Sequence, residues 1–413
     1  MEQNFKRVKL ACYMTSFCMA FISMVSPLLF LTFKNLYNVS FSLLGMLVLI
    51  NFVTQLTVDL LFSFFSHKID SIKMVKIMPF LTAIGFLIYA LVPFFTKTNV
   101  YIGLLIGTIF FSASGGLGEV LMSPIIASIP SKTTDRDISK LHSFYAWGTV
   151  IVVVSLTLFL FVFKQTSWQI FVLISVIFPL ITGYLFLTST FPTLPVTAPE
   201  KASENVFKNR WFWLCFVTIF LGGATECTIS QWASGYIELV ASVPKIWGDI
   251  LGVAIFSVML ALGRSLYAKY GKNMINLLFI LAIGSACCYL VCALSPLPIL
   301  SIIACALSGL FASMLWPGTL IVSTDKLPKG GVMVFALLAA GGDLGASVGP
   351  QLIGSITDII IASDTFIPLS QTLNMTIDQL GLRIGLLAVS ILPVVMILTT
   401  YLIKKQHKKD VKN

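Results

Sequence analysis

Five charged side chains stand inside long apolar stretches of this 413-residue chain: Asp59, Glu119, Glu226, Arg264 and Asp343. A charged side chain at the centre of a bilayer costs about 2.5 kcal/mol or more. Such a residue therefore faces protein or water, pairs with a partner, or carries a proton. The chemistry that these residue types fit is proton binding, ion pairing and hydrogen bonding to a solute.

Glu119 lies in the segment SASGGLGEVLMSP, residues 112–124, about midway along an apolar stretch. At helical spacing its face holds Ser112, Gly115, Gly116 and Ser123, a small and polar stripe that suits a water-filled cavity. We predict that Glu119 binds a proton and also accepts hydrogen bonds from solute hydroxyl groups, with Ser123 beside it. The alternative is a structural acid bonded to a neighbouring helix.

Glu226 lies in GGATECTISQWASGY, residues 222–236, where small and polar residues predict a local helix break. Gln231 can hydrogen-bond hydroxyl groups, and Trp232 can stack on the apolar face of a sugar ring. We therefore predict that Glu226, Gln231 and Trp232 contact the solute. The alternative is a helix-packing surface with aromatic residues at the membrane interface.

Asp343 belongs to the glycine-rich segment GGDLGASVGP, residues 341–350. A half-broken helix with an acid suits ion or substrate binding. Equally, the glycines can serve close packing and the acid can cap a helix fragment. We predict proton coupling through Glu119, Glu226 and Asp343.

Aromatic residues with polar groups complete the predicted solute-binding surface: Tyr145, Trp147 and Trp316. Tyr145 shares a helix face with His142, three residues earlier, whereas Trp316 directly precedes Pro317. Ordinary packing is the alternative for Trp316, and a surface position is the alternative for His142.

The elements that position these residues are helices in a membrane. Hydrophobic residues make up 57% of the chain and charged residues 11%. Apolar runs of about 20 residues, the length that spans the hydrocarbon core as a helix, recur along it. We count them at 8–33, 40–66, 74–96, 100–128, 140–163, 168–191, 209–236, 247–269, 274–294, 297–323, 330–361 and 379–403. The sequence thus predicts an all-α integral membrane protein, and the Gly and Asp residues of the eleventh run favour a break or a kink there.

The distribution of basic residues predicts the orientation. The chain has 27 Lys and Arg and a formal net charge of +10. Arg264 lies inside a helix. Of the other 26 basic residues, 21 lie in the two tails and the loops on the same side of the membrane as the tails. The loops on the opposite side hold only five: Lys34, Lys97, Lys164, Lys245 and Arg383. By the positive-inside rule both termini lie in the cytoplasm. We expect the tail IKKQHKK, residues 403–409, to bind the surface of the cell membrane, and we expect no nucleic-acid partner.

A proline-containing stretch with mixed charge, FPTLPVTAPEKASENVFKNR, interrupts the pattern near the middle of the chain. We predict an N-terminal six-helix bundle at 1–191, a cytoplasmic linker at 192–208, and a C-terminal six-helix bundle with a basic tail at 209–413. At one constant offset Gly116 and Pro124 align with Gly309 and Pro317, which supports two similar halves. Such halves are typical of transporters whose site lies between them at mid-membrane.

Asp59 and Arg264 lie near the cytoplasmic ends of the second and eighth apolar runs, at equivalent places in the two halves. We predict that they form gate contacts between the halves, together with His142. The alternative is local ion pairing or extension of the side chains toward lipid headgroups.

Three stretches resemble the major facilitator superfamily, and within it the fucose/glucose-type sugar symporters: GLGEVLMSP (116–124), LHSFYAWG (141–148) and LLAAGGDLGASVGPQLIGSITD (337–358). The resemblance implies twelve helices in two pseudo-symmetric halves and transport of a sugar or polyol together with a cation. Two features depart from this family. The loop motif after the second helix is degraded to FSHKIDSIK, with His67 at the expected Asp and Asp70 at the expected Gly, and residues 8–33 contain no acid. A proton-coupling acid pair on the first and fourth helices therefore cannot be carried over.

Soluble catalytic and metal-binding signatures are missing from the sequence. All eight cysteines fall within apolar segments without CxxC or Cys/His metal spacing, and no Walker A loop, GxSxG or HExxH occurs. We expect no cofactor, no metal and no enzyme activity.

The sequence thus predicts a monomeric secondary transporter that moves a small-molecule substrate, a sugar or polyol, with protons by alternating access through the lipid bilayer. An exporter of an amphipathic compound with the same fold is the alternative. A polytopic membrane enzyme or sensor is a remote one, since it would need a cluster of acids or histidines such as DxxxD.

Overall fold

The computed structural model describes residues 5–65, 68–95, 99–131, 134–193, 206–271, 273–327 and 331–412. His67 and most of the predicted linker, residues 194–205, lie outside them. Within the described residues twelve helical spans are long and apolar enough to cross a membrane. The predicted fold class and number of spans are confirmed. A helix satisfies its own backbone hydrogen bonds, which hydrocarbon cannot do, so apolar stretches of this length form helices.

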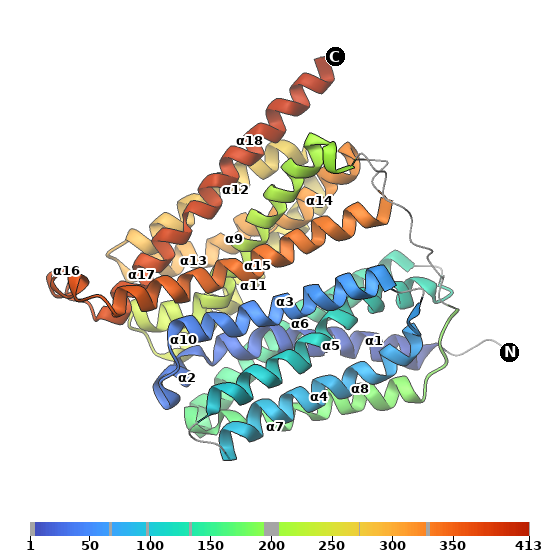
Figure 1. Cartoon of the computed structure of the whole chain (residues 1–413), viewed down its shortest axis with the longest axis horizontal. Coiled ribbons are helices and arrows are strands. Elements are labelled where there is room, and N and C mark those ends of the chain that lie inside the picture. Colours follow the sequence, from blue (N-terminus) through green and yellow to red (C-terminus); the bar gives the residue numbers. More distant parts are fainter. Residues whose placement is uncertain are drawn as a thin grey trace. The chain divides into compact units, whose positions relative to one another are not determined.

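Contacts divide the chain into two compact units, one of residues 1–38 and 50–199, the other of residues 39–49 and 200–413. The helices of the first unit, in chain order, are as follows (Figure 1): α1 (Lys6–Leu28), α2 (Phe30–Tyr37), most of α3 (Phe41–Phe65), α4 (Ser71–Phe95), α5 (Val100–Ser128), α6 (Thr134–Phe163), the 3-10 helix η2 (Gln165–Ser167), α7 (Trp168–Ser175) and α8 (Ile177–Leu187). The start of α3, up to residue 49, belongs to the second unit. Buried side chains such as Val75, Leu121, Ile125 and Phe186 form a core in the first unit.

The second unit contains the remaining helices (Figure 1): η3 (Val206–Lys208), α9 (Arg210–Val240), α10 (Lys245–Trp247), the π-helix η4 (Gly248–Ala254), α11 (Ile255–Tyr270), α12 (Met274–Leu294), α13 (Pro298–Ala312), α14 (Leu315–Lys326), α15 (Gly331–Ile361), η5 (Asp364–Phe366), α16 (Ile367–Thr372), α17 (Ile377–Val389) and α18 (Ile391–Lys412). The most extensive packing in this unit joins α9 to α15.

The helix breaks expected at Glu226 and around Asp343 are absent, because α9 and α15 run unbroken through these positions. The glycines there serve close packing instead. A Cβ atom at Gly223 would collide with the carbonyl of Gly342, and one at Gly345 would collide with the carbonyl of Phe220. Small residues let two helix backbones approach in this way. The glycine-rich segments therefore bring α9 and α15 together without interrupting either helix.

Candidate functional site

A row of polar side chains on α3 faces α5 within the first unit. Asn51, Gln55 and Asp59 are spaced by four residues, which places them on one face of the helix. The amide oxygen of Asn51 accepts hydrogen bonds from Ser112 Oγ at 2.6 Å and from Gln55 Nε2 at 2.8 Å. At Gly116 of α5, an added Cβ would lie 3.0 Å from Asp59 Oδ1. The small residues of α5 thus let the polar face of α3 pack closely against this helix.

This packing corrects one expectation from the sequence. The stripe Ser112, Gly115 and Gly116 does not line a water-filled cavity, because all three residues are buried. Glu119, one turn further along α5, is exposed, and Ser123 is half-buried. The Glu119 side chain therefore stands at the edge of the packed stripe.

Asp59 and Glu119 form a pair of carboxyl groups. Asp59 Oδ1 lies beside Gly116, about one turn before Glu119 on α5, so the two negative charges repel one another. Asp59 is half-buried, and its Oδ1 atom is buried with no hydrogen-bond partner among the described residues. Two neighbouring carboxylates favour binding of a proton, because one proton removes their mutual repulsion. The pair can thus take up and release positive charge.

A second polar cluster lies in the second unit, around Glu226 of α9. Arg264 Nη2 of α11 donates to Glu226 Oε1 at 3.2 Å. The Arg264 side chain is 48% exposed and that of Glu226 is 14% exposed. Oε2 of Glu226 is buried and has no hydrogen-bond partner in the described chain. Glu226, Arg264 and the buried Asp343 all act electrostatically on the Cys227 thiol, so the three charges gather around it.

Asp59 and Arg264, the residues predicted to form a gate, each make a local interaction, which is the alternative that the sequence left open. Asp59 interacts with Glu119 inside the first unit, and Arg264 pairs with Glu226 inside the second. An ion pair in contact with solvent contributes about 0–1 kcal/mol, so the Arg264 pair is a weak link by itself.

The helix break next to this cluster has a simple cause. The span Pro298–Lys326 is interrupted at Ser313 and Met314, between α13 and α14. Pro317 has no N–H group and cannot donate to the carbonyl four residues earlier, which is that of Ser313. Arg264 Nε supplies a donor to this carbonyl at 3.1 Å. An unsatisfied carbonyl at membrane depth costs several kcal/mol, so Arg264 stabilises the break.

Trp316 follows the break directly and contacts α15. An added Cβ at Gly342 would meet the Trp316 indole, so this ring occupies the space beside Gly342 and next to Asp343 in the chain. Trp316 is half-buried, whereas Asp343 is 6% exposed. The structure therefore brings together four of the residues predicted from the sequence: Glu226, Arg264, Trp316 and Asp343.

Gln231 and Trp232 do not belong to this cluster. Trp232 is 1% exposed, its Nε1 donates to the carbonyl of Pro350 at 2.9 Å, and its ring packs against Phe41. Gln231 is 3% exposed. Neither side chain has access to a solute in this structure, so Trp232 serves helix packing instead of the predicted stacking on a sugar.

The predicted residues of α6 divide into two groups. The Tyr145 hydroxyl donates to Ser23 Oγ of α1 at 3.2 Å, and His142 is exposed. Trp147 is 68% exposed and lines an apolar recess of about 300 Å³. The other residues of the recess lie on α1, α6 and α8 and carry no polar side chain: Met14, Phe17, Phe144, Gly148, Ile151 and Phe178. Such a recess suits an apolar group better than a sugar.

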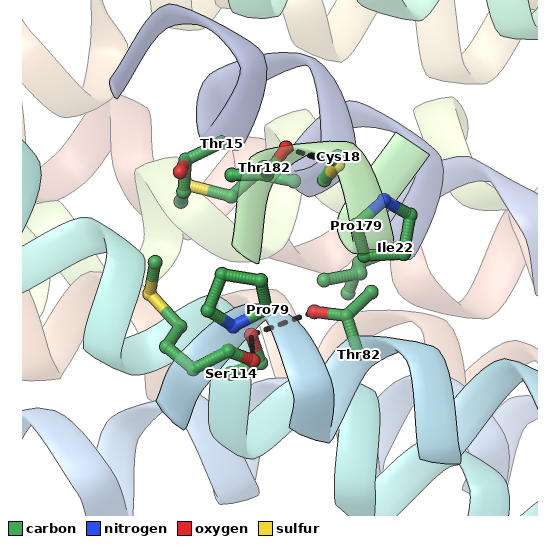
Figure 2. A pocket seen from close by; sticks show the side chains of 10 residues that line it. Thr15, Cys18, Ile22, Pro79, Thr82, Ser114, Pro179 and Thr182 are labelled. Carbon is green, nitrogen blue, oxygen red and sulfur yellow. Dashed lines mark hydrogen bonds between the residues drawn. The ribbon is translucent and has the colours of Figure 1, made fainter. Parts of the chain in front are cut away.

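A second, much smaller cavity lies among α1, α4, α5 and α8 of the first unit (Figure 2). Its volume is about 10 Å³, room for about one water molecule. The hydroxyls on its wall are already engaged, since Thr82 donates to Ser114 at 2.6 Å and Ser114 donates to the carbonyl of Met78 at 2.7 Å. A cavity of this size is too small for a solute.

The described residues contain no group of three or more His, Cys, Asp or Glu side chains that could hold a metal ion. The polar row of Asn51 and Gln55 was missed by the sequence analysis. Their spacing of four from Asp59 was the available signal. The role of Ser313 was also missed, although Pro317 four residues later marks its carbonyl as unpaired.

Comparisons with known proteins give one family. The model of the Major Facilitator Superfamily matches residues 11–350, whereas no curated protein sequence matches the chain. A bacterial homologue of the human lysosomal transporter Spinster, solved in an inward-facing, unoccupied conformation, has 14% identity and a TM-score of 0.76 over 98% of this chain and 97% of that one. A nucleoside transporter has 15% identity and a TM-score of 0.68 over 95% and 99% of the chains. The E. coli fucose:proton symporter has 14% identity and a TM-score of 0.60 over 97% and 99%. At these identities the likeness to solved structures concerns the fold alone.

Proposed function

Because the chain belongs to the Major Facilitator Superfamily, we propose that it is a secondary transporter that moves a small hydroxylated solute, a sugar or polyol, by alternating access. Proton binding at Glu119 drives the movement. The observation that carries this proposal is the pair formed by the exposed Glu119 and the half-buried, incompletely bonded Asp59.

The proton has a defined task in this proposal. With both carboxyl groups ionised, the first unit holds two negative charges inside its membrane-spanning helices, and a conformational change that dehydrates them is costly. One proton on the pair lowers that cost and leaves a carboxylate oxygen free to accept a hydrogen bond from a solute hydroxyl. Solute binding at Glu119 and Ser123 and proton binding at the Asp59–Glu119 pair thereby favour the same transition.

The cluster in the second unit also offers chemistry that suits a polyhydroxylated solute. The half-buried Trp316 offers an aromatic face, and the unbonded Oε2 atom of Glu226 offers an acceptor. The likeness of the fold to a fucose:proton symporter and a nucleoside transporter agrees with a cargo rich in hydroxyl groups. In this proposal the protein lies in the cell membrane with both termini in the cytoplasm and functions as a monomer.

Uptake into proteoliposomes tests the proposal. Labelled sugars and polyols are offered to the reconstituted protein with and without an imposed proton gradient, and Glu119→Gln is compared with wild type. The gradient should drive accumulation in wild type, and Glu119→Gln should abolish accumulation while retaining exchange. Glu238→Gln, which changes a half-buried acid of α9 outside the pair, is the matched control and should still accumulate solute. Uptake that ignores the gradient and is unchanged in Glu119→Gln would refute the coupling.

A second candidate function is export of an amphipathic compound. The apolar recess around Trp147, Phe144 and Phe17 favours it, because an acyl or aromatic group fits such a lining. Thermal unfolding of the purified protein with sugars and with amphiphiles distinguishes the two functions, since a ligand that binds the folded state raises the melting temperature. A rise with amphiphiles that Trp147→Ala removes, without a rise for any sugar, would favour export.

A further inference from the structure

Arg264 is the only side chain in the described cluster of the second unit that contacts both a titratable group and a helix break. Its Nη2 atom donates to Glu226 Oε1 at 3.2 Å, and its Nε atom donates to the carbonyl of Ser313 at 3.1 Å. The guanidinium group is planar and rigid, so both bonds depend on one orientation of the same side chain. A change at either acceptor therefore alters the geometry at the other.

The two acceptors behave differently during a transport cycle. The Ser313 carbonyl is a fixed dipole that always lacks its helical donor, because Pro317 stands four residues later. The Glu226 carboxylate loses its charge when it binds a proton, and its bond to Arg264 is then weaker because it is no longer an ion pair. Cys227 on the same helix and Asp343 of α15 are the other titratable groups that face this site.

The break that Arg264 holds determines the position of Trp316. The helix resumes at once, with the Gly318 N–H donating to the carbonyl of Met314 at 2.8 Å. Trp316 lies in this first turn, with its ring against Gly342 of α15. A shift at the Ser313 carbonyl is therefore transmitted to the Trp316 ring through a single turn of helix.

We propose that Arg264 is a positioning residue that links the charge of Glu226 to the position of Trp316, and so sets the affinity for the solute. With Glu226 ionised, the guanidinium is held by both acceptors and the first turn of α14 is fixed. With Glu226 neutral, only the Ser313 carbonyl directs Arg264, and the turn is released. This inference rests on the proposed function for its effect on solute affinity, but the link between the three residues does not.

Replacing Pro317 tests the connection between Arg264 and the helix break, and this test needs no solute. Arg264→Gln should lower the melting temperature because the Ser313 carbonyl loses its donor. In a Pro317→Ala background, residue 317 regains an N–H group, so the same change at Arg264 should lower the melting temperature clearly less. Arg383 is the matched control: its Nη1 donates to the carbonyl of Ser295 at 2.8 Å in the same unit. Arg383→Gln should cost the same with and without Pro317→Ala. Equal losses for Arg264→Gln in both backgrounds would overturn the connection.

Tryptophan emission tests the link to Glu226. The contribution of Trp316 is the difference between each protein and the same protein carrying Trp316→Phe. Glu226→Gln should shift this emission when Arg264 is present and leave it unchanged in Arg264→Gln, an outcome that a purely structural role for Arg264 does not produce. An identical shift in both backgrounds would overturn the proposal.

The KM for solute uptake tests whether this link affects transport. Glu226→Gln should change the KM for uptake by about fivefold in wild type and by less than about twofold in Arg264→Gln, with kcat changing less than KM. Arg264→Lys keeps the charge but serves one acceptor at a time, so it should retain only part of the link. Absence of solute uptake in wild type would contradict the proposed function, whereas the emission and unfolding measurements would still decide the role of Arg264.

Discussion

The approach of α3 to α5 can be tested at Gly116. An alanine Cβ at this position would lie 2.8 Å from the carbonyl oxygen of Gln55 and 3.0 Å from Asp59 Oδ1, whereas ordinary contact begins at 3.4 Å. Backbone of α3 must therefore move away by about 0.6 Å, because a carbonyl oxygen cannot rotate aside as a side chain can. Overpacking of this kind costs about 1–3 kcal/mol. Gly116→Ala should thus both lower the free energy of unfolding and disturb the Asp59–Glu119 pair.

Gly115 provides the matched control, one residue earlier on the same helix. A Cβ there would meet the end of the Gln55 side chain at 3.3 Å, and this flexible group can move by a few tenths of an ångström. Thermal unfolding and gradient-driven uptake are measured for both variants. Gly116→Ala should lower the melting temperature and the uptake rate, and Gly115→Ala should leave both near wild type. Equal effects of the two changes, or unimpaired coupling in Gly116→Ala, would refute the account of this interface.

Three further outcomes are expected. Asp358 accepts hydrogen bonds from the first two N–H groups of α3, at 3.0 and 2.7 Å, so Asp358→Ala should cost about 1 kcal/mol of stability in thermal unfolding; an unchanged melting temperature would contradict this capping role. The hydrogen bond from Lys9, with a smaller one from Ser131, holds the pKa of Asp137 below its usual value. Because the folded-state pKa is the lower one, this stabilisation is complete above about pH 5 and disappears as the pH falls through the folded-state pKa. The difference in melting temperature between wild type and Lys9→Gln should therefore shrink over that range, and a difference that grows on acidification would be evidence against the pair. Trp147→Ala should leave sugar uptake near wild type, because the recess it lines is apolar; a strong loss would return Trp147 to the sugar site.

The twelve spans were predictable because hydrophobic length is a property of the sequence alone. Whether each helix runs without a break was not predictable in the same way. The glycine-rich segments around Glu226 and Asp343 were expected to break, yet their glycines join α9 to α15 and both helices continue. The break that does occur, at Ser313 and Met314, had a local signal in Pro317, which removes a backbone donor.

The charged residues themselves were identified from the sequence, since their cost in a membrane singles them out. Their partners were not, because pairing depends on which helices pack together. Asp59 interacts with Glu119, some 60 residues away in the chain, and Arg264 pairs with Glu226, 38 residues away. The spacing of Asn51, Gln55 and Asp59 was visible in the sequence, but the face of α5 that receives them follows only from the packing.

Direct measurement of proton movement tests the central claim, that the Asp59–Glu119 pair carries the coupled proton. Wild-type protein is reconstituted into vesicles that contain a pH-sensitive dye, and a solute that the protein transports is added without an imposed gradient. Solute entry should acidify the vesicle interior in wild type, and Glu119→Gln should move solute down its gradient with no change in internal pH. Proton movement that persists unchanged in both Glu119→Gln and Asp59→Asn would contradict the account.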